Sequence, residues 1–275
     1  MSLDLSGPLP RELAPGVHWL GQCQSIPYNG QELHSYSSAY LVIGEQSSAL
    51  FDQGMTCDAG VIQAQLDTLL TAEAPPLRHL FISHHESPHT GGVGRFLERY
   101  PEAIACGDID DLHLVFPEFA DRLRPLDPGD TIDLGGTELR IVGAVFRDMP
   151  YTRWAFDTKR RVLFSSDGFA YTHLHSDQHC GHLAEETVGS LDLDDMTALF
   201  AFAAFHWTQY VDIEPFLMQL DELLAELEVE IVAPTHGLPF SDLDAVLPEI
   251  RKGYRAGSQL GDQSLVDLAS VDGPA

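Results

Sequence analysis

The stretch from Ile82 to Gly92, with the sequence ISHHESPHTGG, decides how the rest of the chain is interpreted. The apolar run 80–82 before it is typical of a buried strand. His84, Glu86 and His89 follow that strand, and the two glycines at the end of the stretch begin a predicted helix. Imidazole and carboxylate groups crowded at a strand end can converge on one ion. The stretch therefore predicts a metal site.

Strands and helices alternate on both sides of this stretch. An apolar repeat of 3.6 residues predicts a helix capped by Asp58 and another over 216–227. Mixed order of this kind is typical of two sheets sandwiched between helices. We expect one domain over 1–257 and a polar tail over 258–275. The expected strands are 40–43, 49–52, 80–83, 103–105, 139–142, 161–164 and 230–233, with a further helix through 96–97.

The composition excludes several classes of partner. The 275 residues carry a net charge of −27, from 42 acidic residues against 15 Lys and Arg. Such a surface repels phosphate backbones, so we expect no nucleic acid and no membrane as partners. The acidic surface suits solubility, and the alternative is that it docks a basic redox protein. The chain has no apolar run of membrane-spanning length and no signal-peptide pattern at Met1, which predicts a cytoplasmic protein.

The four cysteines, Cys23, Cys57, Cys106 and Cys180, stand far apart in the sequence. They form no Cys-x-x-Cys pair, so their spacing does not predict a sulfur-ligated zinc site. Without a secretion signal we expect reduced thiols rather than disulfides.

Three later segments resemble the first in their arrangement, because each places a ligand type just beyond an apolar run. These ligands are Asp148 in RDMP, Asp167 in SSD and His236 in PTHG. Side chains at the ends of neighbouring strands converge on one edge of a sheet. The predicted ligand set is therefore His84, Glu86, His89, Asp148, Asp167 and His236.

With these residues in place, the chain resembles the metallo-β-lactamase superfamily and, within it, the flavodiiron-type branch. The resemblance covers about residues 15 to 250. It implies an αββα four-layer sandwich, an α/β (α+β) fold, and a non-haem diiron site. The segments that carry it are His84-x-Glu86, His89-Thr90-Gly91-Gly92, Ser165-Ser166-Asp167, Pro234-Thr235-His236-Gly237 and 210–216.

The chain departs from that family pattern at two positions. Pro88 stands where the family has an aspartate ligand, and Asp148 stands where it has a histidine. By resemblance, one metal is bound by His84, Glu86 and Asp148. The second keeps only His89 and His236, and Asp167 bridges both. Oxygen-rich sites suit iron or manganese better than zinc, although zinc remains an alternative. We expect two irons, the second held more weakly.

Further histidines could complete or support the site. The segment 172–182 holds His173, His175, His179 and His182, and could supply a ligand or a proton relay. The alternative is a solvated loop. His34 and His206 are predicted to lie beside the ligands, with ordinary surface or packing roles as alternatives.

The sequence is compatible with three functions. The first is a diiron protein that binds or reduces dioxygen or nitric oxide, with electrons from a separate electron-transfer protein. The second is a metal-dependent hydrolase of a small-molecule thioester, lactone or phosphodiester, in which a metal-bound hydroxide attacks. Pro88 argues against it, because the missing aspartate helps to orient that water. The third is a catalytically decayed binding protein. Homo-oligomer formation is left open.

Overall fold

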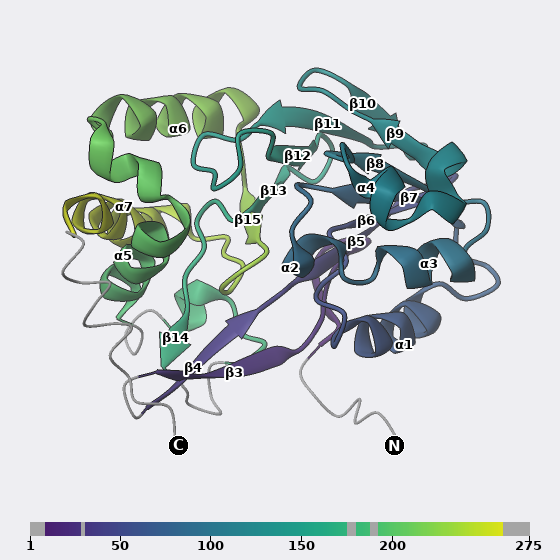
Figure 1. Ribbon diagram of the computed structural model, residues 1–275, viewed down its shortest axis with the longest axis horizontal. Coiled ribbons are helices and arrows are strands. Elements are labelled where there is room, and N and C mark those ends of the chain that lie inside the picture. Colours follow the sequence, from purple (N-terminus) through teal and green to yellow (C-terminus); the bar gives the residue numbers. More distant parts are fainter. Residues whose placement is uncertain (1–8, 29–30, 175–179, 188–191, 261–275) are drawn as a thin grey trace.

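The computed structural model describes residues 9–28, 31–174, 180–187 and 192–260. In this part of the chain, two large sheets pack face to face and helices cover both outer surfaces (Figure 1). This is the predicted αββα four-layer sandwich.

The first large sheet has the strand order β1-β2-β5-β6-β7-β8-β9. Its β6, β7, β8 and β9 run parallel to one another, and β1, β2, β5 and β6 pair antiparallel. The strands are β1 Arg11–Ala14, β2 Val17–Leu20, β5 Ala39–Ile43, β6 Ser48–Phe51, β7 Leu77–Ile82, β8 Ile104–Gly107 and β9 Leu123–Pro125.

The second large sheet has the order β10-β11-β12-β13-β15, and only its β13–β15 pair is parallel. A small third sheet, β14-β4-β3, stands at the side of the sandwich and was not predicted. Its strands carry few of the apolar residues on which the strand predictions rest. The strands are β10 Thr131–Asp133, β11 Glu138–Gly143, β12 Arg153–Asp157, β13 Val162–Ser166, β15 Ile231–Pro234, β14 His173–Leu174, β4 Gln31–Tyr36 and β3 Cys23–Tyr28.

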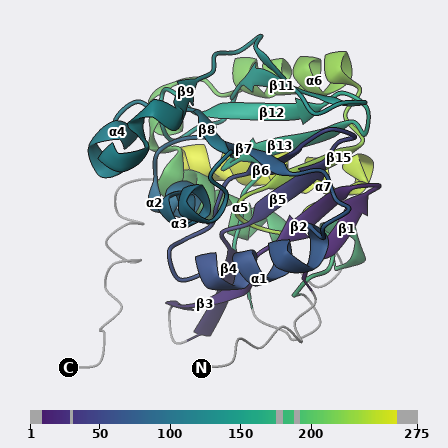
Figure 2. The same cartoon turned by 90° about the vertical axis from the view of Figure 1, so that its right-hand side faces the viewer.

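The helices form the two outer layers. Figures 1 and 2 show α1 and α3 on the side of the first sheet, and α5, α6 and α7 on the side of the second. The helices are α1 Ala59–Leu69, α2 Ser87–Thr90, α3 Val93–Arg99, α4 Leu112–Val115, α5 Leu193–Ala204, α6 Glu214–Leu227 and α7 Leu243–Gln259, with 3₁₀ turns η1 Pro117–Arg122, η2 Ala184–Glu186 and η4 His206–Tyr210.

The central strands are buried on both faces. Leu50 and Leu80 pack in one cluster with α1 and α3, whereas Phe51 and Phe81 face the second sheet. Successive residues point to opposite faces of a strand, so adjacent positions serve different layers. Phe51 stacks on Phe81 at 5.1 Å and on Phe164 of the second sheet at 5.3 Å between ring centroids. These rings join the two sheets directly beneath their strand ends.

The helix α7 escaped prediction for a physical reason. α7 contains Pro248, Gly253 and Gly257, all poor helix formers. The two glycines allow α7 to lie against α5, because a Cβ at Gly253 would come within 2.6 Å of the backbone oxygen of Asp194. α7 also extends to Gln259, so the first two residues of the predicted tail are helical, and 261–275 lie outside the described residues.

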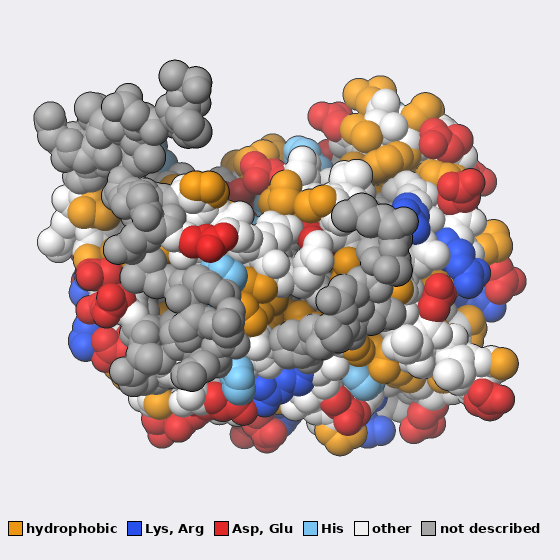
Figure 3. All heavy atoms as spheres, turned by 90° about the horizontal axis from the view of Figure 1, so that it is seen from below, with side chains coloured by type: hydrophobic (Ala, Val, Ile, Leu, Met, Phe, Trp, Pro, Cys, Tyr) orange, Lys and Arg blue, Asp and Glu red, His pale blue; other side chains and the backbone are white. Residues whose placement is uncertain are grey.

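The surface agrees with the acidic composition. On the face drawn in Figure 3, acidic side chains outnumber the few basic ones. Within the described ranges, no helix is both long enough and apolar enough to span a bilayer.

Candidate metal centre

The predicted ligands meet where four strands end at one edge of the sandwich. His84 follows β7, Asp167 follows β13 and His236 follows β15. β13 and β15 are parallel, and β6 and β7 are parallel, so their carboxyl ends lie together. This edge is where open α/β sheets usually hold ligands.

Asp167 stands at the middle of three imidazoles. Its Oδ2 lies 3.5 Å from Nε2 of His84. Its Oδ1 lies 3.4 Å from Nε2 of His89 and 3.3 Å from Nε2 of His236. The two oxygens of one carboxylate thus face different histidines, which is the arrangement that a bridging ligand requires.

His84 also belongs to a second group of donors. Its Nε2 lies 3.5 Å from Oδ2 of Asp148. Ligand atoms of His84, exposed Glu86 and Asp148 all lie within 4.8 Å of one another, as do those of His84, His89 and Asp167. His84 therefore stands between a carboxylate-rich group and a histidine-rich group. The predicted ligands are brought together, including Asp148 from the loop after β11.

Hydrogen bonds fix which nitrogen each imidazole presents. The Nδ1 of His89 donates to Oδ2 of Asp52 at 2.7 Å, and Nδ1 of His236 donates to the carbonyl oxygen of Tyr36 at 2.5 Å. The Nδ1 of His84 lies 3.2 Å from the hydroxyl of Ser166. The Nε2 atoms therefore face the centre. Proteins commonly orient metal-binding histidines in this way, through a hydrogen bond to the other ring nitrogen.

The pKa shifts of His84, His89 and Asp167 indicate that this centre favours a positive charge. Burial disfavours a charged His89, yet the carboxylates of Asp52 and Asp167 hold its pKa well above the ordinary value. Burial likewise disfavours ionised Asp167, but His89 and His236 hold its pKa far below the usual range. Burial and the nearby His89 hold the pKa of His84 well below normal. A proton on His89 thus supplies the positive charge that a metal would bring.

The donor atoms fit a metal. Nε2 of His84, Nε2 of His89 and Oδ1 of Asp167 are buried and have no hydrogen-bond partner in the part of the chain that is described. Buried polar atoms almost always have partners, so such a group points to an absent ion. Oxygen and imidazole donors in this proportion suit iron or manganese.

Asp52, at the end of β6, is a supporting residue that sequence reasoning missed. Its buried carboxylate accepts hydrogen bonds from the amide and hydroxyl of Ser83 at 3.0 Å, from His89 and from Thr235 at 2.7 Å. The signal was present, because Asp52 follows a buried strand as Asp167 does. The apolar run predicts only that Asp52 is the last residue of a strand.

Other predicted residues lie elsewhere. Pro88 is half-buried in α2 and offers no donor atom. The Nδ1 of His85 contacts Asp108 at 3.0 Å. His206 contacts Gln209 and Tyr210 in its own turn, and His34 lies beside Cys23 and Cys180. The supporting roles of His34 and His206 at this centre stay predictions, and His175 and His179 lie outside the described residues.

Comparison with known proteins identifies the fold family. A family model described as ODP family beta lactamase matches residues 36–237. Coenzyme F420H2 oxidase of Methanocaldococcus jannaschii is 22% identical over 93% of this chain and 62% of its own. Type A flavoprotein FprA of Rhodobacter capsulatus is 26% identical over 85% of this chain and 53% of its own. The chain thus spans little more than half the length of these relatives.

A solved structure gives the same fold. Rubredoxin oxygen:oxidoreductase from Desulfovibrio gigas superposes with a TM-score of 0.68 and 18% identity, covering 90% of this chain and 61% of that one. The match supports the αββα architecture.

Replacing Asp52 tests the support of His89. In Asp52→Asn, the amide no longer requires a proton on Nδ1 of His89, so we expect metal affinity to fall about 10- to 100-fold. A chelator-competition titration measures it. The matched control is Asp108→Asn, which alters the carboxylate beside His85, and it should bind metal as the wild type does. Equal affinities in the two variants would contradict the role of Asp52.

The carboxyl of Asp148 predicts a pH dependence. Burial, with the charges of Asp167 and Glu86, raises its pKa from 3.8 to about 7. A proton must therefore leave Asp148 when metal binds below that pH, and apparent affinity should gain up to about tenfold per pH unit from this group, levelling above about pH 7. Asp148→Asn should lose that part of the dependence.

The raised pKa of Asp148 also makes the stability of the folded, metal-free chain depend on pH. Between about pH 4 and about 7, the folded metal-free chain holds a proton on Asp148 that the unfolded chain has released, so this group lowers stability as pH rises. Equal pH dependence of metal affinity in wild type and Asp148→Asn would rule out Asp148 as the titrating ligand.

Proposed function

Because the chain belongs to the family described as ODP family beta lactamase, we propose that its metal centre holds two irons and binds or reduces dioxygen or nitric oxide. The observation that carries the proposal is the placement of Asp167. One carboxylate oxygen faces His84, and the other faces His89 and His236. A carboxylate so placed can hold two metals at a short, fixed separation.

The ligand chemistry supports iron. One proposed site takes His84, Glu86 and Asp148, and the other takes His89 and His236, with Asp167 shared. Glu86 and Asp148 add oxygen donors, which favour iron or manganese over zinc. The first site has more ligands than the second, so we propose that its metal is held more tightly.

The names of relatives support oxygen chemistry. The matched proteins include an oxidase of coenzyme F420H2 and a rubredoxin oxygen:oxidoreductase. These activities belong to longer proteins, of which this chain spans 61 to 62%. For this chain we propose the reaction with a diatomic gas and the need for an electron donor of protein nature.

A hollow beside Asp148 offers a route for a small apolar molecule. Its volume is about 340 Å³, and it is lined by Val145, Arg147, Asp148, Pro150, Trp207 and Phe216. The indole nitrogen of Trp207 donates to the carbonyl oxygen of Arg147 at 2.7 Å, which fixes one wall. The four apolar side chains in this lining suit dioxygen or nitric oxide, which carry no charge and need no polar partners to enter.

The protein's own contribution is orientation and charge. Two irons would supply the electrons that a bound diatomic molecule accepts. Asp52 and the Tyr36 carbonyl hold protons on the outer nitrogens of His89 and His236, so both inner nitrogens remain free to bind metal. Asp148, with its pKa near 7, can hold or release a proton at the wall of the hollow.

Hydrolysis is the second candidate function. Hydrolases of this kind use a hydroxide between metals, and an oriented general base or acid assists. Pro88 has no side-chain group that could orient water, and by the resemblance it stands where the family has an aspartate. The oxygen reaction therefore has the stronger support.

Metal content and oxygen reactivity test the proposal. Protein produced in medium with both iron and zinc should contain about two irons before dialysis. His89→Ala should lose the more weakly held iron, because that variant removes a buried donor. The reduced protein should change its visible absorption when mixed with oxygen. His85→Ala is the matched control, since His85 contacts Asp108 instead, and it should retain both properties.

Two outcomes would contradict this function. The first is zinc, without iron, at the position that His89→Ala empties. The second is turnover of simple esters or phosphodiesters that His89→Ala abolishes, with no reaction of the reduced protein with oxygen.

Restoring the missing ligand tests the weaker second site. Pro88→Asp should raise retained iron from about one to about two ions per chain, because it returns an anionic donor beside His89. Elemental analysis after dialysis measures the change. Ser87→Asp, an exposed neighbour, is the control and should leave the count unchanged. Two tightly held irons in the wild type would show that Pro88 does not weaken metal binding at the second site.

A further inference from the structure

A second cluster of metal-ligating side chains lies outside the first metal centre, called the carboxylate-rich centre, which is formed by His84, Glu86, His89, Asp148, Asp167 and His236. It consists of Cys23, His34, His173 and Cys180, and one ligand atom from each lies within 4.8 Å of all the others. The spacing of the cysteines in the sequence argued against a sulfur-ligated site. The fold brings together residues up to 157 positions apart, which no local spacing reveals.

The small sheet directs three of these side chains to one face. His173 of β14 is the register partner of His34 in β4. Cys23 of β3 pairs with Tyr36, two residues beyond His34 on the same strand. Directly opposed residues, and residues two apart along a strand, point to the same face of a sheet. His173, His34 and Cys23 therefore share a face because of strand register.

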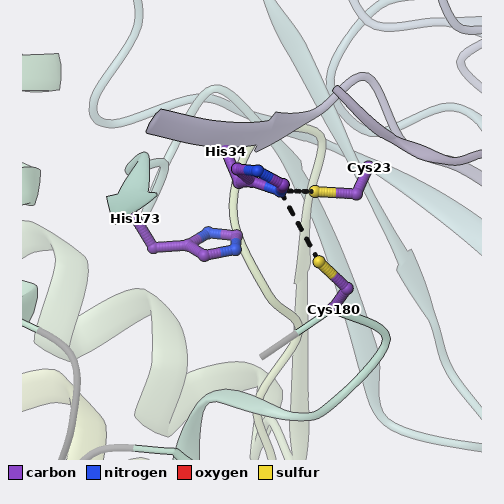
Figure 4. Close-up of side chains that lie close together, drawn as sticks. All are labelled: Cys23, His34, His173 and Cys180. Carbon is purple, nitrogen blue, oxygen red and sulfur yellow. Dashed lines mark hydrogen bonds between the residues drawn. The ribbon is translucent and has the colours of Figure 1, made fainter. Parts of the chain in front are cut away.

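Cys180 reaches the cluster from a turn that is held in place. The amide of Gly181 donates to the hydroxyl of Tyr36 at 2.8 Å, and its carbonyl accepts from Arg11 at 2.9 Å. Figure 4 shows both thiols pointing toward the His34 ring, with the His173 ring alongside. The Sγ atoms of Cys23 and Cys180 lie 2.7 and 3.6 Å from Nδ1 of His34.

The donor set and its burial are those of a structural zinc site. Two thiolates and two imidazoles are a common tetrahedral set for Zn²⁺, and four protein ligands leave no open position for substrate. His34 and His173 are 8% and 1% exposed, and both cysteines are half-buried. The soft sulfur donors of this cluster favour a different class of metal from the carboxylate-rich centre, whose oxygen donors suit harder metals.

We propose that Cys23, His34, His173 and Cys180 form a closed tetrahedral site for Zn²⁺, distinct from the carboxylate-rich centre. The ion joins the strands β3, β4 and β14 of the small sheet to the turn at Cys180. Binding displaces the two thiol protons to solvent and involves no electron transfer.

Cobalt substitution in the reduced full-length chain tests the proposal. Co²⁺ should give the strong thiolate-to-metal absorption and the visible bands of a tetrahedral site. Both should be lost in Cys23→Ser and in Cys180→Ser. They should persist in Cys57→Ser, which removes an exposed thiol outside the cluster, and in His89→Ala, which disables the other centre.

Alkylation of the wild-type chain supplies a measurement that needs no variant to fold. Zinc should slow modification of Cys23 and Cys180, mapped by mass spectrometry, by at least about tenfold, and leave Cys57 unchanged. Absence of the thiolate band, or equal alkylation of Cys23 with and without zinc, would overturn the site. A Cys23–Cys180 disulfide in protein kept under reducing conditions would overturn it as well. Loss of iron chemistry in His89→Ala, with the cobalt bands intact, separates this proposal from the proposed function.

Discussion

The buried carboxylate of Asp52 is the constraint on which the metal centre depends. It accepts hydrogen bonds from Ser83, His89 and Thr235, so one side chain joins the ends of β6, β7 and β15 with α2. Asp52 adopts a left-handed backbone conformation, with φ of 52°, as does Ser166 beside Asp167. Such conformations cost about 1–3 kcal/mol each and persist where surrounding contacts fix them. Here the strained residues lie at the strand ends that carry the ligands.

The apolar core supplies the rigidity that these polar contacts require. Phe51 precedes Asp52 and stacks on Phe81 and Phe164, which come from strands that lead to His84 and Asp167. Close-packed interiors transmit small displacements, so the separation of the two sheets sets the separation of the ligands. The same alternation that buries Leu50 under α1 turns Phe51 to the other sheet. Fold and site are therefore encoded by the same short strands.

The sequence could reveal the parts that depend on local pattern. The strand endings at His84, Asp167 and His236 are local features, and they place the predicted ligands at one edge of the sandwich once an αββα fold is assumed. Asp52 follows a buried strand as Asp167 does, but its four hydrogen bonds come from distant segments, so its position in the sequence does not reveal its role. The cluster of Cys23, His34, His173 and Cys180 was missed for the same reason, since strand register in an unpredicted sheet creates it. The helix α7 was not predicted because it contains glycines, which are poor helix formers but allow close packing against α5.

Tyr36 connects the two clusters. Its carbonyl oxygen accepts from Nδ1 of His236 in the carboxylate-rich centre, and its hydroxyl accepts from the amide of Gly181, next to Cys180. Its ring stacks on that of His173 at 6.3 Å between centroids. Anything that orders β4 therefore also orders a ligand of the other centre, because orientation of a histidine through its outer nitrogen affects metal affinity. The difference between sulfur and oxygen donors would favour different metals at the two proposed sites, even though Tyr36 contacts residues of both.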